Sequence, residues 1–334
     1  MKRKIKLGVL LLLFLNVLAF SSCKKVVEPE KSFPELVSEM NSYKLVGKLE
    51  SMFPSGTKEC EVVVYYKEPN LYRVELTNAG NNEPQVMIKN NEGIYVLLPA
   101  VNKIFKVESS WPDNSSYPYI LQSLSKDIIS DEDLITIKEE TTTTLEFNAK
   151  MFDNAVATKQ KVIFDNETSL PKEVLIYDDL DSLILRFVVE KIEVDINIDE
   201  EKFKVNDSMS SLRVSYAEDP LAFDRLITYP TYYPSGASLI AENISGTTND
   251  KSVCMKFGGD TPFTVIEQYV LSTDNTKTTY VSGSIYTMGG AVCIASNNTI
   301  FFYDSGMEYT LASTHLDYVT LIQVGESLRS SNIK

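Results

Sequence analysis

Acyl-transfer or hydrolytic chemistry of the Ser–His–Asp type needs a histidine base, and this chain of 334 residues contains one histidine, His315. No nucleophile elbow of the G-x-S-x-G form precedes His315. A lone imidazole does not activate a nucleophile unless a serine or cysteine lies against it. We therefore expect His315 to be a surface or turn residue, and we predict no catalytic residue and no enzymatic activity.

Clustered carboxylates suggest a second chemistry, cation binding. Asp178, Asp179 and Asp181 are closely spaced, but the glycine and the terminal glutamate of an EF-hand loop are absent around them. A solvated loop between two strands explains these acids better than a calcium site does. The sequence has no P-loop and no G-x-G-x-x-G turn, and no two cysteines have C-x-x-C spacing. We expect no metal and no other cofactor.

Cys23 has surroundings that indicate a covalent modification. A basic head, KRKIK, precedes the apolar run GVLLLLFLNVLAF, which ends at the SSC of residues 21–23. This order predicts a secretory signal peptide over residues 1–22. The two serines suit the small positions of a bacterial lipobox, in which the cysteine becomes lipidated, while Phe20 stands where leucine is usual. The alternative is an ordinary cut near Ala19, which would leave Cys23 a plain thiol.

Lipidation of Cys23 would anchor the protein on the extracytoplasmic face of a bacterial membrane. Each buried methylene contributes about 0.8 kcal/mol, so two acyl chains such as palmitate hold a protein stably. Residues 23–31 are polar and would form the lipidated tether. No later run is apolar and long enough to span a bilayer.

The other three cysteines are Cys60, Cys254 and Cys293. Cys254 and Cys293 both fall in expected strands, and an extracytoplasmic compartment permits disulfides. One interpretation is a disulfide between these two, with Cys60 as a buried thiol. The alternative is two separate thiols in the core.

The charge of the chain limits its partners. The formal net charge is −14, and removal of the basic signal head makes the mature form more negative. Phosphate backbones repel such a protein, so we expect no nucleic-acid binding.

The elements that would position these residues are mainly strands. Ser32-Phe33-Pro34-Glu35 has the pattern of a helix start with a capping box, and short alternating segments with compact turns follow from Tyr43 to about Val194. This pattern predicts an antiparallel curved sheet or unclosed β-barrel over residues 32–206. A polar linker over residues 207–218 and a smaller α+β domain over residues 219–334 should follow.

One helical segment, residues 117–129, interrupts the strand series. Its apolar residues recur at helical spacing, so it should pack on the concave face of the first sheet beside the N-terminal helix. Such a site is concave and apolar, and an acyl chain would suit it. The candidate ligand-cavity residues are Leu36, Met40, Trp111, Tyr117, Ile120 and Leu124. Ordinary core packing explains the same residues equally well.

Several blocks of the chain resemble the LolA/RseB-like bacterial proteins, the lipoprotein carriers and sigma regulators. The blocks are YKLVGKLESMF, CEVVVYYKEPNLYRVEL, GIYVLLPAVNKIFKVE and VIFDNETSLPKEVLIYD, and the C-terminal segment YPTYYPSGASLIAENI resembles the second domain of Gram-positive relatives. The resemblance includes the clostridial germination lipoproteins, and it implies an α+β fold of mainly antiparallel strands with helices on the concave face.

The resemblance implies two functions. The first is a membrane-anchored lipoprotein that binds an apolar ligand, such as a lipid or a lipoprotein acyl chain, or a protein partner. The second is a regulatory subunit that binds an envelope, sporulation or germination enzyme and has no role as a lipid carrier.

Overall fold

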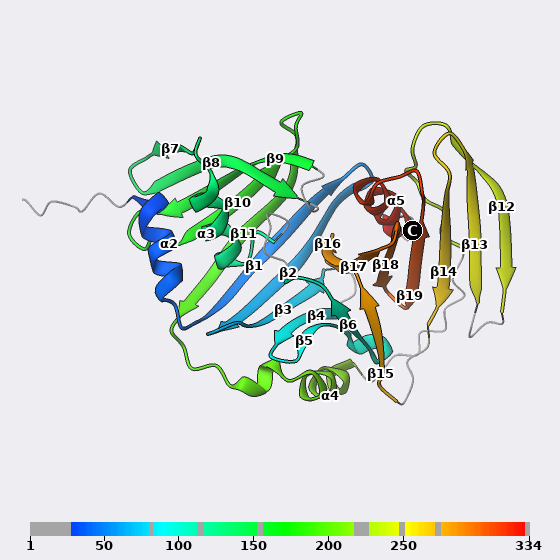
Figure 1. Cartoon of the computed structure of the whole chain (residues 1–334), viewed down its shortest axis with the longest axis horizontal. Coiled ribbons are helices and arrows are strands. Elements are labelled where there is room, and N and C mark those ends of the chain that lie inside the picture. The colour runs from blue at the N-terminus through cyan, green and yellow to red at the C-terminus, as the bar shows by residue number, and fades with distance from the viewer. Residues whose placement is uncertain are drawn as a thin grey trace, which may run out of the picture.

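The structure is a computed structural model, and it describes residues 28–79, 83–111, 117–151, 156–216, 227–246, 251–270 and 275–330. Two β-sheets make up most of it, and helices lie on their faces (Figure 1). The predicted signal peptide and Cys23 lie outside the described residues. No helix within the described ranges is long and apolar enough to cross a membrane.

The first sheet has 12 strands in the order β15-β6-β5-β4-β3-β2-β1-β11-β10-β9-β8-β7. The sheet has two free edges, β15 and β7, so it is not closed into a barrel. Its strands other than β15 are β1 Ser42–Phe53, β2 Gly56–Lys67, β3 Leu71–Asn78, β4 Pro84–Asn90, β5 Gly93–Leu98, β6 Lys103–Glu108, β7 Ile135–Lys138, β8 Thr142–Met151, β9 Val156–Asp165, β10 Pro171–Tyr177 and β11 Leu183–Val194.

Alternating burial determines which face each central strand turns to the core, and one close contact occurs where β1 meets β11. Apolar side chains of β1 and β2 point to one face at every second position, as half-buried strands require. The register of β1 against β11 shifts at Gly47. A Cβ at Gly47 would lie 2.6 Å from the Phe187 ring, so only glycine leaves room for this buried ring.

Two helices pack on the concave face of the first sheet, as expected. These are α2 (Pro29–Glu39) and α3 (Leu121–Ser130), whose apolar sides join one buried cluster with the sheet. Helix α2 begins earlier than the capping-box pattern predicts, so residues 29–31 are helix and not tether. Pro29 occupies the first turn, where its fixed φ suits a helix and its missing N–H is not needed. The Ser32 hydroxyl instead bonds Glu28 O and Ser169 Oγ.

The predicted linker over residues 207–218 is wrong for most of its length, because α4 (Val205–Tyr216) occupies it. This helix covers the convex face of β4 to β6. Along β4 the burial changes face at each step: Met87 belongs to the concave cluster, and Val86 and Ile88 form a separate cluster with Met209. The short helix η3 (Glu200–Phe203) precedes α4, and η2 (Pro99–Val101) joins β5 to β6.

The second sheet has seven strands in the order β12-β13-β14-β19-β18-β17-β16, and α5 (Tyr318–Ser330) packs on one of its faces. Its strands are β12 Ala237–Ser245, β13 Ser252–Gly259, β14 Phe263–Tyr269, β16 Ser284–Met288, β17 Ala291–Ser296, β18 Thr299–Asp304 and β19 Met307–Ala312. The remaining strand, β15 (Lys277–Ser282), leaves this sheet and pairs in parallel with β6 at the edge of the first sheet.

Specific polar contacts join the two sheets. The buried Gln85 amide donates to Tyr303 O and accepts from Val292 N, so both of its groups are satisfied by the second sheet. Lys103 pairs with Glu308, and Gly290 lies so close to Cys60 that a Cβ on it would be 2.8 Å from the Cys60 Cβ. The predicted fold class, mainly antiparallel α+β with an unclosed curved sheet and a smaller α+β part, is confirmed.

Candidate partner-binding surface

The six predicted cavity residues come together on the concave face of the first sheet. Leu36 is partly buried there, and the other five are at most 8% exposed. Trp111 stacks on Tyr72 with 5.0 Å between ring centroids. All six belong to one packed cluster, so in this structure they are core residues.

The second sheet also covers this concave face. The Tyr117 hydroxyl donates to Ile285 O, and the Tyr119 hydroxyl shares a hydrogen bond with Thr287 Oγ1. Ile285, Val292 and Ile294 of β16 and β17 belong to the same buried cluster as the two helices. Side chains from both halves of the chain therefore occupy the hollow of the first sheet.

The predicted disulfide between Cys254 and Cys293 is wrong. Both are free thiols, on β13 and β17. Three strands lie between β13 and β17, which separates the two by about 19 Å at the usual strand spacing, whereas a disulfide needs Cα atoms within about 7 Å. Cys293 is fully buried, and Cys60 is also buried, on β2. His315 is exposed in the turn before α5, where its Nδ1 contacts Thr314 Oγ1.

A group of exposed apolar side chains lies at the β12 end of the second sheet. Every residue of β12 after Ala237 is exposed. Six large apolar side chains gather on and beside this strand: Tyr229, Tyr233, Leu239, Ile240, Ile244 and Ile266. Exposed apolar side chains scattered singly are ordinary, whereas a contiguous group marks an interaction site.

Both faces of β12 contribute to this group. Opposite residues in a ladder share a face, so Leu239 and Ile244 lie on the α5 side with Phe257 and Val253. Ile240 is the extra residue at a bulge and leans over Gly258 on the other side, which we call the open face. Among the described residues β12 pairs only with β13, so no described strand pairs with the backbone groups along its outer edge.

A groove of about 420 Å³ lies on the open face beside β12. Its lining residues are Ile240, Lys256, Phe257, Gly258, Pro262, Phe263, Thr264, Asn297, Asn298, Thr299, Ala312, Ser313 and Thr314. Gly258 and Ala312 keep it shallow but open, because neither extends a long side chain into it.

An extended strap, residues 227–235, lies on the α5 side of β12 to β14. The Thr228 N–H donates to the Glu267 carboxylate on β14, and the Tyr229 hydroxyl donates to Glu242 on β12. Ser327 of α5 donates to Tyr232 O. Glu267 is 1% exposed, and burial raises its pKa to about 7. The strap therefore depends in part on a buried carboxyl group.

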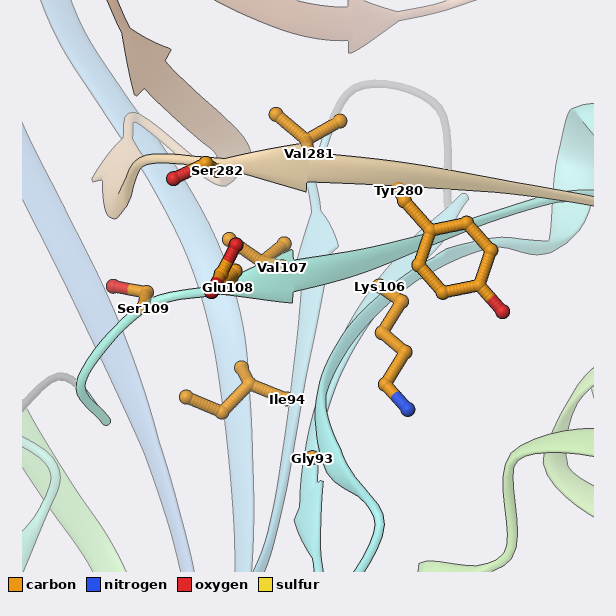
Figure 2. A pocket seen from close by; sticks show the side chains of 9 residues that line it. All are labelled: Gly93, Ile94, Lys106, Val107, Glu108, Ser109, Tyr280, Val281 and Ser282. Atoms are coloured by element: carbon orange, nitrogen blue, oxygen red, sulfur yellow. The ribbon is translucent and has the colours of Figure 1, made fainter.

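A second hollow, of about 510 Å³, lies at the β15 edge (Figure 2). The Tyr280 ring and the Lys106 side chain project together from neighbouring strands, and Glu108, Ser109 and Ser282 lie at the strand ends. The Lys106 amine lies 5.3 Å from the Tyr95 ring centroid, and a hydrogen bond with Tyr95 raises its pKa. The positive charge of Lys106 therefore already interacts with Tyr95 within the protein.

The sequence predicted the cavity residues as a group but missed the β12 surface. The one available signal was the pair Leu239-Ile240. Two adjacent bulky apolar residues do not fit strict alternation, and they mark either a bulge or a strand with two apolar faces.

The fold and the surface define a two-sheet, mainly antiparallel protein with a group of exposed apolar side chains at a sheet edge. A family model described as "Sporulation protein YdcC-like" matches residues 2–203. The chain belongs to this family. The sporulation protein YdcC of Bacillus subtilis (strain 168) is 27% identical over 339 residues, which cover 100% of both chains.

Solved structures of related fold include MucB, at 13% identity and a TM-score of 0.36, with 89% of this chain and 95% of MucB covered. A LolA superfamily protein from Nitrosomonas europaea is similar at 9% identity and a TM-score of 0.34, over 54% of this chain and 99% of its own. The predicted relationship to LolA/RseB-like proteins is confirmed in this sense. At these TM-scores, no site, partner or activity carries over to this chain.

Proposed function

We propose that this chain is a non-enzymatic extracytoplasmic lipoprotein, anchored through Cys23, that acts in sporulation by binding a protein partner at the β12 edge. The observation that carries the proposal is the group of exposed apolar side chains on an unpaired edge strand. Extended segments add to such edges through backbone hydrogen bonds, and flanking side chains supply specificity. The names of the family and of its B. subtilis relative support the link to sporulation.

The alternative of an acyl carrier is less well supported. An acyl chain would have to displace residues such as Leu124 and Tyr117, which are at most 1% exposed. Opening that cluster exposes apolar area at about 25 cal/mol per Å². A carrier would therefore need α2 and α3 to lift from the sheet.

The anchor is tested by Cys23→Ala. Wild-type protein should partition into the detergent phase and incorporate labelled fatty acid, and the variant should do neither. Membrane partitioning by the variant, with no label in the wild type, would refute the anchor.

The binding site is tested by capture from native membranes. The double variant Ile240→Asp and Ile244→Asp should lose a stoichiometric partner that the wild type retains. Ile135→Asp with Ile137→Asp is the matched control, because these exposed isoleucines lie on β7, at the other end of the molecule. Equal capture by all three proteins, or co-purified lipid in place of a protein, would contradict the proposal.

A further inference from the structure

The open-face groove has a defined floor. Lys256, Thr264, Ala312 and Thr299 lie in one row across β13, β14, β19 and β18, because each is the register partner of the next. Gly258 lies beside this row, and the Ile240 side chain stands above Gly258. Three strand spacings make the row about 14 Å long, which matches roughly four residues of extended chain.

The charge in the groove has the opposite sign to the charge of the chain. Lys256 is the one charged residue among the described residues that line the groove. Within the described ranges no ion pair engages it, although the chain has 46 acidic residues. A cation without a carboxylate partner on a protein of net charge −14 creates a local site for an anion.

The remaining lining suits a polypeptide. The Thr264 and Thr299 hydroxyls and the amides of Asn297 and Asn298 supply donors and acceptors along one wall. Ile240, and Ile266 in the next row of the open face, are 67% and 37% exposed and supply apolar contacts. A ligand that contacts Lys256 and both isoleucines has a carboxylate next to apolar side chains.

We infer that this groove takes a short acidic and apolar segment of the protein partner, with a carboxylate on Lys256 Nζ and apolar side chains against Ile240 and Ile266. The inference rests on the proposed function and adds the chemistry of the partner. A second copy of this chain is disfavoured as the occupant, because two surfaces of a strongly acidic protein repel each other.

Two labelled synthetic heptapeptides test this chemistry: one alternates valine with glutamate, and the other alternates valine with lysine. Binding to the full-length chain in detergent at low salt is followed by fluorescence anisotropy. The glutamate peptide should bind about tenfold more tightly than the lysine peptide, since charge-assisted hydrogen bonds are the strong ones. Salt should reduce this preference.

Variants locate the effect. Lys256→Glu should reverse the preference and Lys256→Gln should abolish it, while Gly258→Val should weaken both peptides by filling the floor. Lys277→Glu on β15 is the matched control and should change nothing. Circular dichroism and thermal unfolding establish that each variant is folded. If a Lys256 variant does not fold, Lys256→Met takes its place.

Failure of the glutamate peptide to bind, or a preference that Lys256→Glu leaves unchanged, overturns the inference. Self-association of the wild type that Lys256→Glu abolishes also overturns it, in favour of a second copy. If the β12 variants still lose their native partner, the proposed function survives these results. If the wild type captures no partner from native membranes, the proposed function itself is refuted, whatever the peptides show.

Discussion

At the residue scale, the three described cysteines differ in burial, and their reactivity should differ with it. Cys254 is partly exposed on the open face, two residues from Lys256. Cys293 is fully buried, and burial raises the pKa of its thiol to about 12. The thiolate is the reactive species, so Cys293 should be inert at neutral pH.

We predict that Cys254 reacts first with maleimide in the folded Cys23→Ala protein, and that Cys60 and Cys293 react only after unfolding. Mass spectrometry of tryptic peptides after a short labelling pulse measures this. Cys254→Ser is the control and should leave the folded protein unlabelled. Rapid labelling of Cys293 would mean that the second sheet is not packed as described.

Gln85 is the residue that most specifically ties the two sheets together. Gln85→Leu should lower the free energy of unfolding by about 2–4 kcal/mol, because Val292 N would lose the Gln85 acceptor and Tyr303 O would lose the Gln85 donor. Urea unfolding measures the loss. Gln268→Leu, at an exposed position of β14, should cost less than about 0.5 kcal/mol. If both variants lose the same free energy of unfolding, Gln85 does not specifically join the two sheets.

At the element scale, sequence patterns predicted the strands well and the ends of helices poorly. Alternation in segments such as residues 60–66 identifies a half-buried strand because side chains change face at every step. The start of α2 was predicted at Ser32, since a capping box is a local signal, but Pro29 extends the helix without any side-chain cap. The α4 segment looked like a linker because residues 207–213 are mostly polar, although Val205, Met209 and Leu212 mark its buried side.

The candidate sites show the same limit. Apolar periodicity identified Tyr117 and Leu124 as inward-facing, but whether a concave face is open depends on what covers it. Here β16 and β17 cover it, more than 150 positions later in the chain, and no local pattern reports such a contact. The β12 surface was missed because exposure at a sheet edge depends on which strand is last.

The strap over β12 to β14 should respond to pH through Glu267. Its pKa is about 7 in the folded protein, against 4.5 for the ordinary group, and the largest cause is burial. Between these pH values the folded state binds more protons than the unfolded state, so stability falls as pH rises through this window. Well above pH 7 the loss is complete and amounts to roughly 3 kcal/mol.

Glu267→Gln should remove this slope and make the protein more stable than the wild type above pH 7, because glutamine still accepts from Thr228 N–H and carries no charge. Thermal unfolding at pH 5 and pH 8 tests it. Glu242→Gln, at an exposed position on β12, is the comparison variant and should leave most of the slope. A wild type whose stability is constant over this range would refute the assignment.

At the scale of the whole molecule, the described chain begins at one end of the longest axis and β12 lies at the other (Figure 1). The Glu28 carboxylate at the start of α2 pairs with Lys138 of β7, which keeps the beginning of the described chain at the β7 end of the first sheet. An anchor at Cys23 would therefore hold the β7 end near the membrane and present the β12 surface away from it.

The first sheet also depends on the second half of the chain. A fragment of residues 24–206 would lack β15 and would expose β6, whose sequence KIFKVE favours strand pairing. We predict that this fragment self-associates or aggregates while the full-length protein does not, as light scattering would show. A monomeric fragment of residues 24–206 would mean that β15 is dispensable.

The parallel pairing of β15 with β6 has a consequence for export. Thr276 bonds Asn102 across a sequence separation of 174 residues. The proposed extracytoplasmic location implies export, and an exported chain emerges from the translocation channel starting at its N-terminus, so β6 would reach the outside well before the strand that covers it. During that interval the nascent first sheet has a bare edge beside a crowded membrane. Mutations that slow translocation between residues 108 and 277 should lengthen the interval and lower the yield of native protein, even if they leave the stability of the finished fold unchanged.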